Sequence, residues 1–179
     1  MVYVFLADGF EIIEAMAPID MLRRAKVDVT TVGIDSKVIT SSCGIPVTAD
    51  VTSDEFEFTD VEAIVIPGGA LGVTNLEKSA LVQSAIDEAV ECGALICAIC
   101  AGPSILGHKG LLKGKNAICY PGFENALEGA IISDDYVVAD GNYITAKGAG
   151  VCIEFGLEIV KKLVGNEAAE AVRSAIQCR

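Results

Sequence analysis

The chain has 179 residues, of which 52% are hydrophobic, and 13 Lys and Arg stand against 25 Asp and Glu, a formal net charge of −12. This acidity repels phosphate backbones, and the pairs Arg23-Arg24 and Lys161-Lys162 are too small a basic patch to overcome it, so we expect no nucleic-acid partner. No apolar run approaches the roughly 18 residues of a membrane-spanning helix and the N-terminus has no basic start, so we expect neither a membrane span nor a signal peptide.

Apolar segments between glycine and charged turns predict one globular domain over residues 1–179, with elements that alternate in type. In chain order the predicted elements are a strand (2–7), a helix (11–25), a strand (26–34), a short hairpin or extended excursion (37–53), a strand (61–69), a helix (79–93), a strand (94–99), a helix (102–109), a hairpin (136–146) and two helices (149–164 and 167–177). Strands that alternate with helices favour a mainly parallel sheet, because parallel strands need crossover connections. The sequence therefore predicts a doubly wound α/β fold, three layers thick, with an antiparallel insertion.

Glycine-containing loops follow three of the predicted strands: ADGFE (7–11), PGGALG (67–72) and AICAGP (98–103). In a doubly wound sheet, ligands bind beyond the carboxyl ends of the strands. We therefore expect the functional site where these loops meet.

Cys100 is the first candidate for chemistry, because it lies in AICAG between a buried strand and a helix. The pattern small-x-nucleophile-x-Gly is typical of a nucleophile elbow, in which small neighbours permit a sharp turn. A thiol at a helix N-terminus is predicted to have a lowered pKa, since the backbone N–H groups favour the thiolate. The alternative is a buried structural cysteine, but the strand–turn–helix context favours the nucleophile.

The cysteine count is seven, an odd number, which in a chain without a secretion signal indicates reduced thiols and a cytoplasmic location. A disulfide between Cys97 and Cys100 is not expected, because three residues of extended chain cover about 10 Å. We expect four cysteines in the core: Cys92, Cys97, Cys119 and Cys152. Two others, Cys43 and Cys178, are candidates for exposure.

The single histidine, His108, lies eight residues beyond Cys100 along the same predicted helix, about 12 Å away. It is therefore not expected to act as the base of a Cys–His pair, and it fits the helix C-terminus, where a cation is favourable.

A carboxylate is the remaining candidate partner for the thiol. Asp8 and Glu11 have the spacing of a capping box, which accounts for Glu11. Glu14 lies within IIEAMAPI and has no such explanation. A carboxyl group in apolar surroundings has a raised pKa and can hold or donate a proton near neutral pH. The other interpretation is an exposed helical glutamate.

The glycines of Pro67-Gly68-Gly69 allow a backbone N–H to come close to the molecule bound at the nucleophile elbow. Together with the N–H of Ala101, such a group could form an oxyanion hole. An ordinary strand-to-loop turn explains the same glycines. A phosphate loop is excluded because no GK[ST] follows.

Four blocks of the sequence, ADGFEIIEAMAPIDMLRRA, VIPGGALG, ICAICAGPSIL and TAKGAGVCIEFGLEIVKKLVG, resemble the ThiJ/PfpI superfamily. The similarity is strongest to the branch of the Parkinson-disease-associated protein deglycase and its bacterial relatives, and it covers nearly the whole chain in family order. The resemblance implies a flavodoxin-like sandwich related to class I glutamine amidotransferases. It also implies a homodimer and a site without a metal or organic cofactor.

The resemblance also implies roles for individual residues. Cys100 matches the reactive elbow cysteine, and Glu14 matches a protonated glutamate that hydrogen-bonds its sulfur. Gly69 and Ala101 match the backbone amides that line a small pocket. Ala101 also stands where the protease-like branch carries a histidine, so a peptidase is disfavoured.

Two positions depart from the family pattern. Tyr120, in CYPG, replaces a histidine of members with glyoxalase activity, and tyrosine is a poor base near pH 7. An arginine pair that lines the family's dimer interface is matched only by Arg24, because the second position falls at about Cys43. Tyr120 and Arg24 are therefore candidate auxiliary residues.

Two functions compete at this point. The first is a glyoxalase- or deglycase-like enzyme in which Cys100 attacks small reactive carbonyls. The second is a non-enzymatic oxidative-stress sensor or chaperone in which Cys100 is oxidised to a sulfinate, and Tyr120 favours it slightly. Nothing in the residues supports the thiamine-pathway role suggested by the older family name.

The dimer surface is expected to include the apolar side of the first helix. Its members are Met16, Ile19 and Met21. The alternative is that these side chains face the sheet.

Overall fold

The computed structural model describes residues 1–178, and within them a seven-stranded sheet has the order β10-β11-β7-β6-β1-β2-β5. The strands are β1 (Val2–Leu6), β2 (Val29–Gly33), β5 (Val51–Thr52), β6 (Ala63–Ile66), β7 (Leu95–Ile99), β10 (Val137–Asp140) and β11 (Tyr143–Ala146). Neighbouring strands run parallel except β10 and β11, which form the predicted hairpin. The prediction of a mainly parallel, flavodoxin-like α/β sandwich is confirmed.

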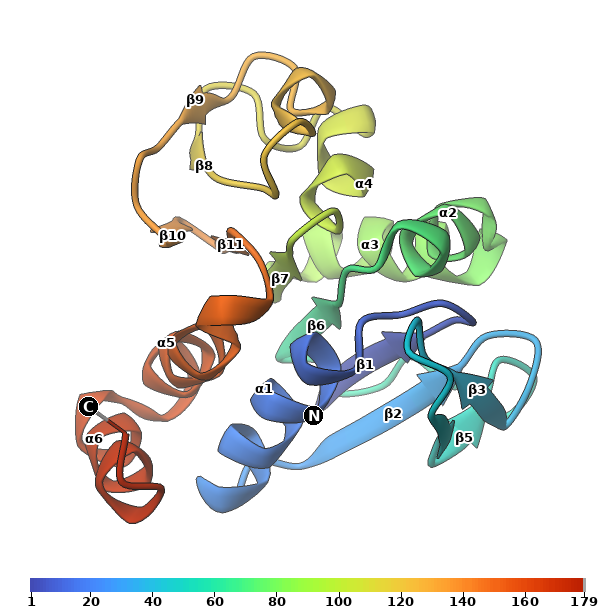
Figure 1. Ribbon diagram of the computed structural model, residues 1–179, viewed down its shortest axis with the longest axis horizontal. Coiled ribbons are helices and arrows are strands. Elements are labelled where there is room, and N and C mark those ends of the chain that lie inside the picture. Colours follow the sequence, from blue (N-terminus) through green and yellow to red (C-terminus); the bar gives the residue numbers. More distant parts are fainter. Residues whose placement is uncertain (179) are drawn as a thin grey trace.

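Two small sheets lie outside this one. β3 (Val38–Thr40) and β4 (Pro46–Thr48) form an antiparallel hairpin within the predicted 37–53 excursion, and the chain then returns to the main sheet as β5. β8 (Asn116–Ala117) and β9 (Ile131–Ile132) pair in parallel in the segment between β7 and β10. This segment forms a lobe above the carboxyl end of β7 (Figure 1).

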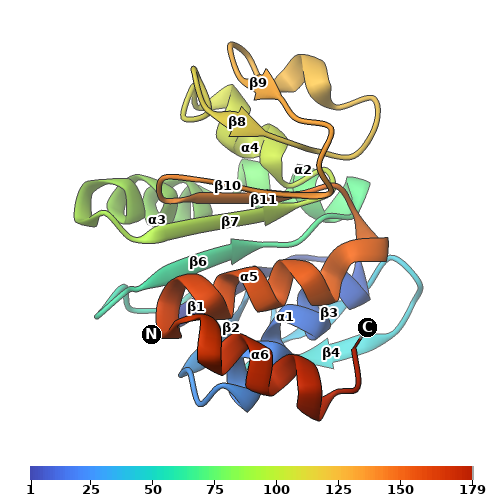
Figure 2. The same cartoon turned by 90° about the vertical axis from the view of Figure 1, so that its left-hand side faces the viewer.

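Helices cover both faces of the sheet, as Figure 2 shows. They are α1 (Ile12–Arg24), α2 (Ala70–Lys78), α3 (Ala80–Cys92), α4 (Pro103–His108), α5 (Cys152–Val164) and α6 (Asn166–Ala175), with 3₁₀ turns η1 (Glu124–Ala126) and η2 (Ala149–Val151). Alternate β1 residues point to opposite faces, so Val4 packs in the core under α1 and α5 while Phe5 packs in the core under α2 and α3. Among the described residues, no helix is both long and apolar enough to cross a bilayer.

Close packing of α1 against α5 bears on the predicted dimer surface. Ile19 and Met21 are 6% and 4% exposed, because both belong to the core that α1 and α5 share. A Cβ on Gly156 of α5 would lie 2.9 Å from both Met21 Cγ and Pro18 Cα, so only glycine fits this crossing. Met16 is half-buried against the same core. Ile19 and Met21 are therefore core residues within one chain and are not available to a partner.

The start of α1 also differs from the prediction. Glu11, not Asp8, is the N-cap, and its carboxylate accepts a hydrogen bond from the Glu14 N–H at 3.0 Å. Asp8 Oδ1 instead accepts from the N–H of Thr40 at 2.7 Å and so ties the first loop to β3. The predicted capping box is wrong because the helix begins later than the spacing indicated.

A second difference is α2, which begins within the predicted loop (67–72) and continues through residues for which the sequence predicted no element. Gly72 is inside this helix, and a Cβ there would lie 2.6 Å from Phe10 Cα. The glycines that suggest a loop in PGGALG therefore serve close packing of a helix against the first loop.

Burial of the cysteines matches most of the predictions. Cys97, Cys119 and Cys152 are buried, Cys43 is exposed, and Cys178 is only partly exposed. Cys92 is expected in the core and is exposed, because it is the last residue of α3, at the exposed end of that helix.

Thr145 in β11 connects the sheet to the lobe between β7 and β10. Its side chain is 1% exposed, and its hydroxyl accepts a hydrogen bond from the buried N–H of Ile118 at 3.0 Å. Thr145→Val leaves that donor unpaired, so we expect the free energy of unfolding to fall by about 2 kcal/mol in urea denaturation. Thr145→Ser keeps the hydroxyl and serves as the control. Equal losses in both variants would contradict this role for the hydrogen bond.

Candidate active site

The three predicted loops meet at the carboxyl ends of β1, β6 and β7. The Glu11 N–H donates to the carbonyl of Gly68 at 3.0 Å, which joins the first loop to the second. A Cβ on Gly68 would lie 2.6 Å from the Cβ of Cys100, which joins the second to the third. The prediction that these loops meet at this edge of the sheet is confirmed.

Cys100 adopts the geometry of a nucleophile elbow. It follows β7 directly and has a φ of 64°, a left-handed conformation that is unfavourable for a residue with a side chain. A Cβ on Gly102 would lie 2.8 Å from the carbonyl oxygen of Ile66, so glycine is needed two residues later. The backbone of Cys100 is held on both sides, donating to Ala146 O at 2.9 Å and accepting from Tyr120 N at 2.8 Å.

Glu14 is fully buried, which excludes the exposed helical glutamate. Its Oε2 accepts a hydrogen bond from Gly68 N at 2.9 Å, and its carboxyl contacts the thiol of Cys100. Oε1 has no hydrogen-bond partner of good geometry within residues 1–178. Burial raises the pKa of Glu14 from 4.5 to about 7, with the charge of Glu11 adding to it and the contacts with Cys100 and Gly68 opposing it.

The pKa of Cys100 differs from the prediction. Burial, followed by the charge of ionised Glu14 and the hydrogen bond to it, raises this pKa from 9.0 to about 12. The backbone N–H groups of Gly69 and Ala101 act in the other direction, because both reach the sulfur. The expected lowering of this pKa by backbone N–H groups is outweighed, because the thiol is desolvated by burial and faces a carboxylate. When Glu14 is protonated, its charge is removed and the two amides remain to stabilise a thiolate.

The two candidate auxiliary residues lie in different places. The Tyr120 side chain is 51% exposed, and a Cβ on Gly148 would lie 3.3 Å from its ring and 4.0 Å from Glu14 Oε1. Tyr120 therefore borders the site. Arg24 lies in the last turn of α1, about 15 Å along the helix from Glu14, where it pairs with Asp20 at 2.8 Å. Within one chain Arg24 does not reach the site.

His108 is also outside the site, as predicted. It is the last residue of α4, and its Nδ1 lies 2.5 Å from an oxygen of Glu77 in α2.

Two residues of the site were not singled out from the sequence. Gly148 lies close to both the Tyr120 ring and Glu14, and Cys152 donates from its thiol to the carbonyl of Ala149 at 2.8 Å, which fixes the turn after β11. Burial, then the charge of Glu14, raises the pKa of Cys152 from 9.0 to about 12. The glycine run in TAKGAG, directly after a predicted strand, is the signal that points to this fourth loop.

Burial of Glu14 makes protein stability depend on pH. Because its pKa rises from 4.5 to about 7 on folding, between these values the folded chain holds a proton that the unfolded chain has lost. Stability is therefore full below pH 4.5 and falls as pH rises through 7, by up to about 3 kcal/mol relative to Glu14→Gln. Urea denaturation of both proteins at pH 5, 6, 7 and 8 measures this difference. Glu91→Gln on the exposed side of α3 is the control, and a difference independent of pH would contradict the prediction.

Together, the sheet and its carboxyl edge define a flavodoxin-like α/β protein with a cysteine at a nucleophile elbow. The model of the DJ-1/PfpI family matches residues 1–162, and the chain belongs to that family.

Relatives match over nearly the whole chain. Protein dj-1beta of Drosophila melanogaster is 32% identical over 176 residues, which are 97% of this chain and 94% of that protein. The glutathione-independent glyoxalase DJR-1.2 of Caenorhabditis elegans is 31% identical over 163 residues, 90% of this chain and 87% of that protein. The structure of oxidized Toxoplasma gondii DJ-1 superposes with a TM-score of 0.95 at 31% identity, covering 99% of this chain and 97% of that one.

Proposed function

We propose that this protein converts small 2-oxoaldehydes such as methylglyoxal into 2-hydroxy acids through Cys100, without a metal or organic cofactor. The observation that carries the proposal is the contact between the Cys100 thiol and a fully buried carboxyl group whose pKa is about 7. A group with this pKa can both accept and return a proton at neutral pH. The glyoxalase name of the Caenorhabditis elegans relative agrees with this chemistry.

The proposed reaction begins when Glu14 takes the thiol proton and the sulfur attacks the aldehyde carbon. A C–S bond forms, and the Gly69 and Ala101 amides donate to the aldehyde oxygen as it gains negative charge. The oxygen then takes that proton back from Glu14, which gives a hemithioacetal and leaves Glu14 ionised. Ionised Glu14 next moves the proton on that carbon to the neighbouring carbon, while the hydroxyl proton passes to the neighbouring oxygen, which gives a thioester of the 2-hydroxy acid. Water cleaves the C–S bond and releases lactate, so the reaction consumes one aldehyde and one water and needs no oxidant.

Unpaired Oε1 supports the role of Glu14 in this sequence. A buried carboxylate oxygen without a hydrogen-bond donor is costly, and a substrate proton or hydroxyl can satisfy it. Tyr120 borders Gly148, as does Glu14 Oε1, and is proposed to donate a hydrogen bond to the second substrate oxygen, not to act as a base.

The test is lactate formation from methylglyoxal by the purified protein in thiol-free buffer, with Cys100→Ser as the blank. Lactate above the blank supports the enzyme. Lactate equal to the blank at matched protein concentrations overturns it.

The second candidate is the oxidation sensor, which the same contact favours. In it, the Cys100 thiolate reacts with two molecules of hydrogen peroxide, gives a sulfinate and releases two waters. A protonated Glu14 would donate to the sulfinate, and the Gly69 and Ala101 amides would hold its oxygens. Mass spectrometry after peroxide treatment tests this reading, since it requires two added oxygens on Cys100 and none in Glu14→Gln under the same dose. It is the function we would assign if lactate formation fails.

A further inference from the structure

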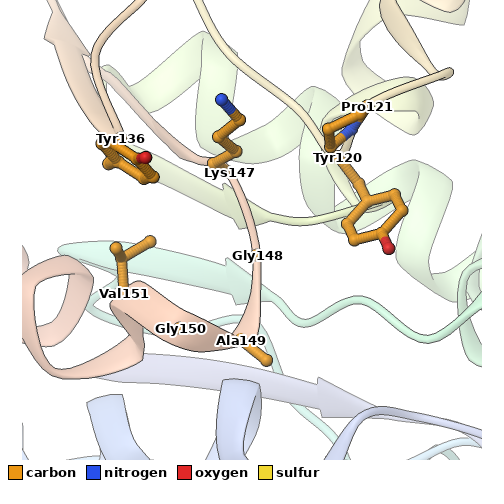
Figure 3. Close-up of a pocket in the computed structure, with 8 residues that line it drawn as sticks. All are labelled: Tyr120, Pro121, Tyr136, Lys147, Gly148, Ala149, Gly150 and Val151. Carbon is orange, nitrogen blue, oxygen red and sulfur yellow. The ribbon is translucent and has the colours of Figure 1, made fainter.

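A cavity of about 360 Å³ adjoins the candidate site. It is bounded by the segment after β8, the residue before β10 and the turn between β11 and α5, as Figure 3 shows. Its lining residues are Tyr120, Pro121, Tyr136, Lys147, Gly148, Ala149, Gly150 and Val151. Cavities of this size fall in the range of small-molecule binding sites.

The cavity lies next to the reacting groups. A Cβ on Gly148, which lines the cavity, would lie 3.3 Å from the ring of Tyr120 and 4.0 Å from Oε1 of Glu14. The Cys100 backbone is hydrogen-bonded to Tyr120 on one side and to Ala146, two residues before Gly148, on the other. The cavity therefore adjoins the position that a substrate carbonyl bound at Cys100 would occupy.

The walls are chemically uniform. Apart from Lys147, every lining side chain is apolar or aromatic, and no carboxylate lines the cavity. Tyr120 and Tyr136 lie on opposite sides of Lys147 in Figure 3. The Lys147 ammonium lies over the Tyr136 ring, 4.9 Å from its centroid, which holds this otherwise exposed ring in place.

Methyl groups are too small for such a space, so methylglyoxal would leave most of it empty. We propose that the cavity is a subsite for an aromatic substituent on the substrate carbonyl, so that the protein prefers aryl 2-oxoaldehydes to methylglyoxal. The proposal rests on the proposed function and identifies its substrate class. An aromatic ring fits because it packs on Tyr136 and on the aliphatic wall formed by Val151 and Ala149.

The experiment compares phenylglyoxal with methylglyoxal, measured as mandelate and lactate formation. We expect kcat/KM to be at least fivefold higher for phenylglyoxal, mainly through a lower KM. Tyr136→Ala removes one wall, and we expect it to reduce kcat/KM for phenylglyoxal about fivefold more than for methylglyoxal. Tyr136→Phe retains the ring and should retain the preference. Val90→Ala, an exposed apolar side chain on α3, is the matched control and should change neither rate.

Binding of the products mandelate and lactate tests the subsite independently of whether the protein turns over either aldehyde. Mandelate and lactate affinities are measured by NMR titration of the wild-type protein and of Tyr136→Ala. Turnover of methylglyoxal without preference for phenylglyoxal would overturn the subsite and leave the enzyme. If neither aldehyde is turned over, the proposed function fails, and tighter binding of mandelate that Tyr136→Ala weakens would still support the subsite. Equal affinities of mandelate and lactate would overturn the subsite. Equal affinities are also expected if a second copy of the chain covers the cavity.

Discussion

Replacing Cys100 with serine is expected to reduce lactate formation from methylglyoxal on the order of a thousandfold or more. The serine hydroxyl occupies the same elbow, but it is far less acidic than a thiol, and Glu14 with a pKa of about 7 is too weak a base to activate it. The assay uses matched concentrations of both proteins and an enzymatic measurement of lactate.

Two exposed cysteines provide controls for this variant. Cys43→Ser and Cys92→Ser remove thiols at the surface, and both proteins are expected to retain the wild-type rate. A similar loss in either control would show that the rate depends on thiols in general. Retention of the rate in Cys100→Ser would show that the thiol at the elbow takes no part in the reaction.

Gly69→Ala is expected to lower the free energy of unfolding by about 4 kcal/mol or more. Gly69 has a φ of 91°, which residues with a side chain rarely adopt, and its Cβ would lie 2.3 Å from Gly9 O and 2.7 Å from Glu11 N. These are backbone atoms and cannot rotate away. The substitution therefore forces apart the first two loops of the site, and its amide should no longer reach Cys100.

Two other glycines serve as controls that distinguish backbone strain from the close approach of the two loops. Gly165 has a φ of 102° and nothing within 4 Å of its Cβ position, so Gly165→Ala reports backbone strain alone. Gly150 has open space and no left-handed φ, so Gly150→Ala should be nearly neutral. Urea denaturation of the three variants should give the largest loss at Gly69. A loss at Gly165 equal to that at Gly69 would mean that the close approach of the loops contributes nothing.

Much of the fold could be predicted because its elements are strongly patterned. Buried strands such as Ala63–Ile66 and Leu95–Ile99 are short unbroken apolar runs, and the Asp140-Gly141 turn identifies the single hairpin of the main sheet. Helix α2 was missed because glycines close to Pro67 normally end regular structure. Here Gly72 instead allows a helix to approach Phe10, a contact between distant residues that no local pattern reports.

For the site, prediction was accurate where one short segment determines the geometry and failed where several segments meet. The Cys100 elbow depends on Ala101 and Gly102 beside it, so its backbone could be anticipated. The pKa of its thiol could not, because it depends on burial and on Glu14, 86 positions earlier in the chain. The same holds for Tyr120, whose position beside Gly148 arises only when the lobe folds onto the end of β11.

The hydrogen bonds of the Cys100 backbone have a consequence for biosynthesis. Its N–H is held by Ala146 and its C=O by Tyr120, and β7 itself pairs with β11, so the elbow is completed by chain that is made 46 residues after the cysteine. During synthesis Cys100 leaves the ribosome well before these partners. Until they arrive, the thiol is an ordinary cysteine on an incomplete sheet, with neither its strained conformation nor its buried carboxyl neighbour fixed in place. The site therefore forms late, and a truncated chain that ends before residue 146 cannot assemble it.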